Sequence, residues 1–228
     1  MGIGVSQVKV LAIANPAGGV GKTTLSHCLA VAFAEFGKKT LLIDLDPAAQ
    51  LTFRLGYENP RITITEFISG VKLTEENLVI TSERFDFIAS DSRLAANLDE
   101  SALSQLLLKL PKDYDLVILD IPSTLTQSLG AAISAADQIL VPVSQSLHSL
   151  RGLIQLRKIT NKPITAIGIG EVNYEELTPV LDVAILRSDE VEIAASSDLS
   201  VLTLSKSSEV SESYRSAAYS VLEILGLE

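Results

Sequence analysis

The chain has 228 residues, of which 47% are hydrophobic and 20% charged, and its formal net charge is −10. This length can bury one sizeable core, so we expect a single domain over residues 1–228, and the single cysteine excludes an internal disulfide and fits a reducing cytoplasm. No run approaches the ~18 apolar residues of a membrane span, and the acidity argues against coating by nucleic acid through bulk charge, so we expect a soluble cytoplasmic protein.

Apolar runs and helix-spaced apolar residues alternate along the sequence. In chain order we predict a strand over 8–14, a helix over 23–36, a strand over 40–45, a helix over 63–69, a strand over 86–89, a helix over 94–110, a strand over 116–121, a helix over 127–136, a strand over 138–143, a helix over 147–159, strands over 164–169 and 182–186, and helices over 190–195 and 210–225. Such alternation predicts an α/β fold: a mostly parallel, doubly wound sheet with helices on both faces. Ligands of these sheets bind at the carboxyl ends of the strands.

A glycine-rich loop joins the first predicted strand to the first predicted helix. Glycines let successive backbone N–H groups turn toward phosphate oxygens, and the helix start adds the positive end of its dipole. Lys22 supplies a charge for the β and γ phosphates of ATP, and the Thr23 hydroxyl can ligate Mg²⁺. The strict Walker pattern fails at Pro16, where it requires glycine. We expect ATP to be bound by Gly18, Gly19, Val20, Gly21, Lys22, Thr23 and Thr24.

Acidic residues follow two of the predicted strands. Asp120 ends a buried strand, where a carboxylate is costly unless it meets a cation. A Mg²⁺ reached through water supplies that cation. Asp44 and Asp46 lie two residues apart at the end of the strand over 40–45, so alternation turns both toward one side, although the chain is leaving the strand there.

These motifs resemble the ParA/MinD family of partition ATPases. The resemblance rests on the GGVGKT loop, on Gly-Lys-Lys at 37–39 before the second strand, on Asp-Leu-Asp-Pro at 44–47 after it, and on residues 114–122 as the second Walker box. It implies a P-loop NTPase fold, a dimer that sandwiches ATP, and Mg-dependent ATP hydrolysis. Phosphoryl transfer needs positioning and charge neutralisation more than a strong base.

The resemblance also implies residue roles. It implies that Asp46 orients the attacking water, while Asp44 lies nearer the Mg²⁺ and the loop, with Thr23 and Asp120 as the other metal residues. Asn173 falls in a later nucleotide loop, where its amide could read the adenine edge, although it is equally typical of a turn. The backbone of Leu186 and Arg187 would pack around the ring.

Ala17 departs from the family pattern. The family carries a lysine there that reaches the partner subunit's nucleotide, so either hydrolysis is badly impaired or another cation replaces it. Arg151 is the best candidate, because no acid lies between Gln138 and Arg151, although a DNA-facing or solvated arginine fits equally well. In lacking this lysine, the chain resembles McdA, the ATPase that spaces carboxysomes along the nucleoid.

We therefore expect an ATPase switch that dimerises on ATP, associates with the nucleoid, binds DNA without sequence preference, and positions a cargo through an adaptor protein that stimulates hydrolysis. The DNA surface would draw on Arg157, Lys158, Lys162 and Arg215. A plasmid or chromosome partition ATPase is the nearest alternative, and an ATP-dependent ligase on the same fold is another. A MinD-like membrane-cycling regulator needs a basic amphipathic terminal helix, whereas residues 213–228 hold one base.

Overall fold

The computed structural model describes residues 8–96, 98–111, 113–123, 127–173 and 179–228. Within them, eight strands form one sheet in the order β3-β4-β2-β5-β1-β6-β7-β8. The strands are β1 (Lys9–Ile13), β2 (Thr40–Asp44), β3 (Val79–Ile80), β4 (Asp86–Ile88), β5 (Leu116–Asp120), β6 (Gln138–Val143), β7 (Ile164–Ile169) and β8 (Val180–Ile185). Every pairing is parallel except that of β3 with β4. The mostly parallel sheet predicted from the sequence is therefore confirmed.

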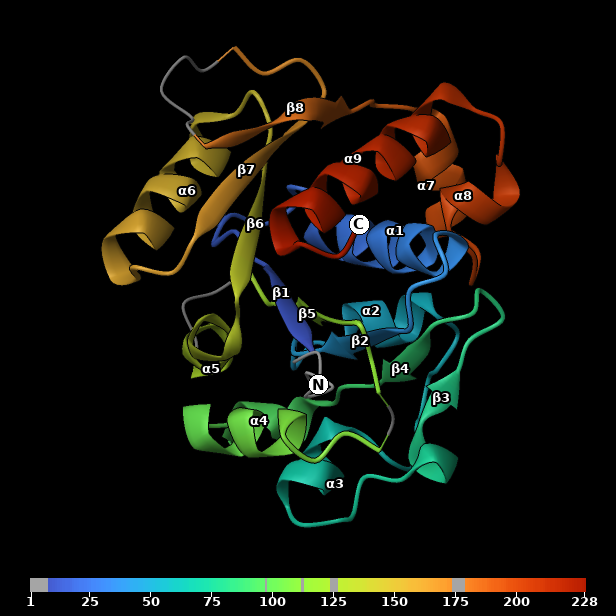
Figure 1. Ribbon diagram of the computed structural model, residues 1–228, viewed down its shortest axis with the longest axis vertical. Helices are drawn as coiled ribbons and strands as arrows, with labels where there is room; N and C mark the ends of the chain where they lie inside the picture. The colour runs from blue at the N-terminus through green and yellow to red at the C-terminus, as the bar shows by residue number, and fades with distance from the viewer. Residues whose placement is uncertain (1–7, 97, 112, 124–126, 174–178) are drawn as a thin grey trace, which may run out of the picture.

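Helices cover both faces of this sheet (Figure 1). They are α1 (Lys22–Glu35), α2 (Gln50–Arg54), α3 (Ile64–Ile68), α4 (Glu100–Leu107), α5 (Gln127–Ala135), α6 (Leu147–Ile159), α7 (Asp189–Ala195), α8 (Val201–Leu204) and α9 (Glu209–Leu225), with 3₁₀ turns η1 (Glu75–Asn77) and η2 (Ser92–Ala96). One core joins α3, α4, α5 and α6 to the sheet, and a second core joins α1, α8 and α9 to the opposite face. Alternation along β1 explains the division, because Val10 and Ala12 enter the first core while Leu11 and Ile13 enter the second.

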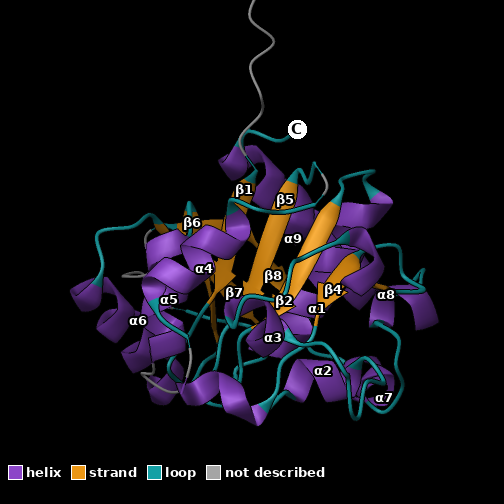
Figure 2. Ribbon diagram, turned by 90° about the horizontal axis from the view of Figure 1, so that it is seen from below, coloured by secondary structure: helices purple, strands orange, loops and turns teal. Residues whose placement is uncertain are grey.

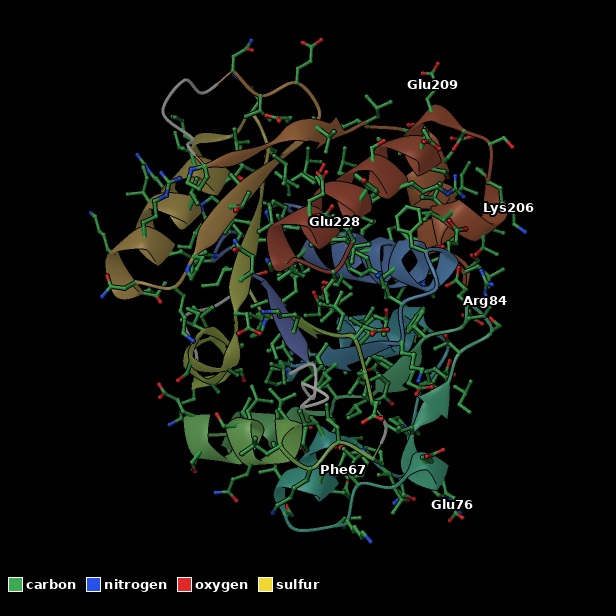
Figure 3. All side chains as sticks on the ribbon, in the orientation of Figure 1. Phe67, Glu76, Arg84, Lys206, Glu209 and Glu228 are labelled. Atoms are coloured by element: carbon green, nitrogen blue, oxygen red, sulfur yellow. The ribbon has the colours of Figure 1, made fainter. Side chains whose placement is uncertain are left out.

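The side chains of the two layers follow the same division. In Figure 3, Phe67 lies on α3 in one layer, while Arg84 and Lys206 mark the turn before β4 and the segment after α8 on the side of the molecule that carries α1 and α9. The long helix α9 packs apolar residues, including Tyr214, Ala218 and Leu222, into the second core. No helix in the described part of the chain is long and apolar enough to cross a membrane.

One predicted element was wrong. The helix expected over 94–110 is instead the 3₁₀ turn η2 followed by the shorter helix α4, with Asn97 between them outside the described residues. The Asp99 side chain accepts the backbone N–H of Ala102 and caps α4, so this short polar residue starts a new helix instead of continuing an old one. The sequence prediction also missed β3, α2 and α8, whose two, five and four residues are too short for a periodic signal.

The carboxyl ends of the central strands meet at one edge of the sheet. Asp120 and Asp44, the last residues of β5 and β2, are register partners, and Asp120 also pairs with Ile13, the last residue of β1. In Figure 2, α2 and α7 lie at the same end of the molecule, and both border one cavity. This edge therefore gathers the polar residues that the sequence places after β1, β2 and β5.

Candidate functional site

The loop between β1 and α1 has a backbone that only glycine adopts easily at two positions. Gly19 has φ 68° and Gly21 has φ 87°, both in the left-handed region. Gly21 is the residue before α1, and no side chain caps the helix there. The N–H groups of the first turn are therefore left for a ligand, at the positive end of the helix.

Asn15 anchors the start of this loop to two other segments. Its side-chain amide donates to the carbonyl oxygens of Pro142, on β6, at 2.9 Å and of Ser149, on α6, at 3.2 Å. Its side-chain oxygen accepts the backbone N–H of Ala17 at 2.9 Å. Gly152 makes this contact possible, because a Cβ on Gly152 would lie 1.9 Å from that same oxygen. The first turns of α6 are therefore packed directly against the loop.

Lys22 is buried, and its ammonium group meets neutral acceptors. Nζ donates to the carbonyl oxygen of Ala17 at 2.9 Å and to Oγ of Ser123 at 2.7 Å. Burial lowers the pKa of Lys22, and the nearby carboxylates of Asp120 and Asp46 oppose that shift. A buried ammonium with only neutral hydrogen-bond partners is a favourable place for an anion such as a phosphate.

Asp120 is buried at the end of β5 and is bonded to the first helix. Its two carboxylate oxygens accept the hydroxyls of Thr23 at 3.0 Å and Ser26 at 2.7 Å. Burial raises the pKa of Asp120 to about 6, although these hydroxyls and Lys22 pull it downward. A divalent cation near this carboxylate would stabilise its charged form.

Asp44 and Asp46 have different surroundings. Asp44 is fully buried and accepts three hydrogen bonds, from the backbone N–H of Asp46 and from the backbone N–H and hydroxyl of Thr52. Burial, with the nearby charge of Asp120, raises the pKa of Asp44 to about 8. Asp46 is half-buried and lines the cavity beside the loop. Asp44 thus holds the turn that presents Asp46.

Two cavities adjoin the loop and share Gly19, Val20, Gly21 and Thr24. We call the first, of about 340 Å³, the phosphate cavity after the ligand predicted from the sequence, and its further lining is Lys22, Thr23, Asp46, Gln50, Arg54, Ile121 and Ser123. The second, about 360 Å³, is bordered by Ile169, Ile185, Leu186, Arg187, Ser188 and Tyr214, among others. The structure thus places Leu186 and Arg187 at a cavity that also borders the loop.

Two other predicted site residues, Asn173 and Arg151, border neither of these two cavities. Asn173 is exposed, its backbone N–H bonds the Gln145 side chain, and it borders neither cavity; residues 174–178 beside it lie outside the described residues. Arg151 is exposed on α6, next to the Gly152 that packs on the loop. The structure therefore places Arg151 near the loop without giving it a contact there.

The four predicted DNA-binding bases do not form one surface. Arg157 and Lys158 are in the last turn of α6, and the Lys162 ammonium donates to the carbonyl oxygen of Ala136. Arg215 is on α9, which covers the opposite face of the sheet from α6, and it is paired with Glu35 at 2.7 Å. Any basic surface on α6 therefore excludes Arg215.

Sequence reasoning missed residues that the structure puts at the site. They are Asn15, Ser26, Thr52, Arg54, Ser123 and Gly152. Ser26 had a readable signal, since it lies one helical turn beyond Lys22 on the same face of α1. The others depend on contacts between segments far apart in the sequence.

The residues at this edge fit a magnesium nucleotide. Among the described residues, no group of three or more His, Cys, Asp or Glu side chains could hold a metal alone. Mg²⁺ keeps several waters and is commonly bound by few protein groups plus substrate phosphates. The Thr23 hydroxyl and the Asp120 carboxylate, beside the buried Lys22, are such a partial set of ligands.

Comparisons with known proteins agree with this geometry. Residues 8–167 match the family model described as an AAA domain. The chain is 34% identical over 183 residues to the chromosome-partitioning ATPase Soj of Thermus thermophilus, covering 76% of this chain and 72% of that protein. It is 32% identical over 159 residues to the sporulation initiation inhibitor protein Soj of Bacillus subtilis, covering 65% of this chain and 63%, less than two thirds, of that relative.

Solved structures show the same architecture. The chain is similar to a variant McdA of Cyanothece in complex with ATP, with 25% identity and a TM-score of 0.80 over 98% of each chain. It is also similar to cobyrinic acid a,c-diamide synthase of Mycobacterium smegmatis with a bound ATP analogue and magnesium, with 28% identity and a TM-score of 0.76 over 94% of each chain.

Proposed function

The chain belongs to the ParA/MinD family of partition ATPases, and from this premise we propose that it binds Mg²⁺–ATP at the loop over 18–24 and hydrolyses it as a molecular switch. The observation that carries the proposal is the buried Lys22 beside the Thr23–Asp120 pair, at the start of a helix whose first turn no side chain caps. A magnesium ion, when bound, would neutralise charge on the transferred phosphate.

In this proposal the residues of the ATP site have separate roles. Lys22 exchanges its bonds to Ala17 and Ser123 for phosphate oxygens, and the N–H groups at the start of α1 bind the phosphate chain. Thr23 and Asp120 hold the metal, directly and through water, respectively. Asp46 orients the attacking water, and Asp44 is a positioning residue that fixes the turn carrying Asp46. Leu186 and Arg187 pack at the nucleoside.

We further propose that two ATP-loaded copies form a sandwich dimer, with Arg151 of each copy serving the other's nucleotide. Support comes from the place of Arg151 on α6, whose neighbour Gly152 touches the loop at Asn15, and from Ala17, which offers no cation. An arginine supplied in trans plays this role in other nucleotide hydrolases. Bases near the end of α6, Arg157 and Lys158, would then bind nonspecific DNA on the nucleoid.

The cargo would be positioned through an adaptor that stimulates hydrolysis. The similarity to McdA and the alanine at position 17 favour carboxysomes, and the similarity to Soj favours a chromosome or plasmid. Membrane binding through α9 has less support, because the apolar face of that helix is buried in the second core. DNA capture by the ATP-loaded protein that falls steeply with salt would support the nucleoid proposal, since counterion release requires it. Capture that ignores ATP and salt would contradict it.

A synthase of the cobyrinic acid type is a second candidate, favoured by the 28% identity to that enzyme. Such an enzyme needs a second substrate beside the phosphates. One cavity of about 580 Å³, between α3 and α4, shares no lining residue with the phosphate cavity, whereas another of about 540 Å³, between α2 and α7, shares Gln50 and Arg54 with it. Phosphate release without any added second substrate distinguishes the switch from the synthase.

The first experiment measures ATP binding with a fluorescent ATP analogue. Lys22→Ala is expected to weaken binding by about 100-fold, the order expected for losing charged hydrogen bonds, without changing the unfolding temperature by more than a few degrees. Lys206→Ala is the matched control, because Lys206 is an exposed lysine outside both cavities. Wild-type affinity in Lys22→Ala would overturn the proposed function.

A further inference from the structure

Arg54, the last residue of α2, has a guanidinium group that the described chain does not satisfy. Nη1 donates to Oγ1 of Thr24 at 2.9 Å. Nε and Nη2 are both buried and have no hydrogen-bond partner in the described part of the chain. Leaving buried charged donors unpaired is costly. The two free donors therefore point to a partner that comes from outside the described chain.

The location of Arg54 narrows the kind of partner. Arg54 lines the phosphate cavity together with Lys22 and Thr24, and it also borders the adjoining cavity between α2 and α7. Its bonded neighbour Thr24 belongs to both cavities over the loop. The guanidinium is thus held against the segment whose N–H groups are left free at the start of α1.

The charges of the phosphate cavity favour an anion. Its described lining holds two cations, Lys22 and Arg54, and one acid, Asp46. No carboxylate of the described residues forms an ion pair with Arg54. A planar guanidinium with parallel free N–H groups matches the oxygens of a phosphate, which it can bind at two points. The small, buried Ala17 supplies no charge on its side of the loop.

We propose that Arg54 is a phosphate-binding residue of this chain, whose Nε and Nη2 bind the phosphate chain of ATP in the same copy that carries the loop. The inference rests on the proposed function, because it assigns a further residue to the proposed ATP site. It gives the site a second cation in cis beside Lys22. A purely structural role would account for the bond from Nη1 to Thr24. It would not explain why Nε and Nη2 are buried without hydrogen-bond partners in the described chain.

The test measures displacement of a fluorescent ATP analogue by ATP and by inorganic tripolyphosphate, under conditions that allow no turnover. Arg54→Ala is expected to weaken both competitors by about 10- to 100-fold, the range for losing hydrogen bonds to a charged group. Arg61→Ala is the matched control, since Arg61 is exposed and does not line the phosphate cavity. The thermal unfolding midpoint of each nucleotide-free variant is measured in parallel.

The possible results distinguish a failure of the proposed ATP binding from a failure of the role given to Arg54. If the wild-type protein binds neither ATP nor tripolyphosphate, the proposed function fails. If the wild-type protein binds both and Arg54→Ala binds them equally well, only the role of Arg54 is overturned. Should Arg54→Ala fail to fold, Arg54→Lys decides: it keeps the charge, loses the planar fork, and is expected to weaken both competitors by about 3- to 10-fold. Unchanged affinity in Arg54→Lys would also overturn the inference.

Discussion

Glu83 ties three distant segments together, and its removal gives the sharpest stability prediction. The residue lies in the turn before β4 and is buried. Its carboxylate accepts the backbone N–H of Ser200 at 3.0 Å, the Ser200 hydroxyl at 2.6 Å and the hydroxyl of Thr203. Nε2 of the buried His27, on α1, lies 2.5 Å from the other carboxylate oxygen. We predict that Glu83→Gln destabilises the fold in a pH-dependent way.

The magnitude follows from the pKa. Burial alone would raise the pKa of Glu83, but the hydrogen bond and charge of His27, with the bonds from Ser200 and Thr203, lower it from 4.5 to about 2. Such a difference between the unfolded and folded states is worth about 3 kcal/mol of unfolding free energy. Because the folded-state pKa is the lower one, this contribution is complete above pH 4.5 and is lost as the pH falls toward 2. At pH 3 about half of it remains.

The assay is urea unfolding of the wild-type protein and Glu83→Gln between pH 7 and pH 3. Taking the difference between the two proteins removes the acid sensitivity of every other carboxylate. Glu76→Gln is the control, because Glu76 is an exposed glutamate in η1 (Figure 3). The wild-type advantage over Glu83→Gln should shrink from about 3 kcal/mol at pH 7 toward half at pH 3. If the difference in unfolding free energy between the two proteins stays constant with pH, the buried Glu83 is not ionised in the folded state and the reasoning is refuted.

Three further predictions concern the proposed ATP site. Asp46→Ala should bind ATP but release phosphate about 10²- to 10⁴-fold more slowly and accumulate as a dimer in sizing columns; unchanged turnover would move the role elsewhere. Gly152→Ala should lower the free energy of unfolding in urea by about 1–3 kcal/mol, because its Cβ would overlap the Asn15 oxygen. Combining it with Asn15→Ala should recover part of that loss, and strict additivity of the two losses would contradict the contact. Arg151→Ala should bind ATP as a monomer yet lose turnover by about 10³- to 10⁵-fold, and a dimer that still hydrolyses ATP would exclude Arg151.

Much of the fold was predictable because its signals are local. Five-residue and six-residue strands buried on both faces leave uninterrupted apolar runs, and the predicted ranges 147–159 and 164–169 coincide with α6 and β7. The loop was predictable because glycine at a left-handed position, followed by lysine and threonine, is constrained residue by residue. Elements of two to five residues, such as β3 and α2, leave no period to detect.

The rest of the site could not be predicted because it depends on register and on pairing across the fold. Nothing in the sequence around Arg54 indicates that its guanidinium reaches Thr24, thirty residues earlier. Glu83 is also surrounded by ordinary turn residues, yet it meets Ser200 across the molecule. The different roles of Asp44 and Asp46 follow from the turn after β2, where the chain leaves the strand and alternation no longer tells which side a residue faces.

The Thr23–Asp120 bond shows how one hydroxyl can belong to both states of the proposed switch. In the structure Thr23 donates its proton to Asp120, which uses only the donor side of the hydroxyl. The oxygen lone pairs remain available for Mg²⁺, so metal binding need not break the bond to Asp120. Lys22 differs, because its present acceptors, the Ala17 carbonyl and Ser123, compete for the same N–H groups that phosphate would take. Nucleotide binding would therefore release Ala17 and Ser123 while leaving Thr23 and Asp120 joined, so any change of conformation is expected to start at the loop and at Ser123 and not at the sheet edge.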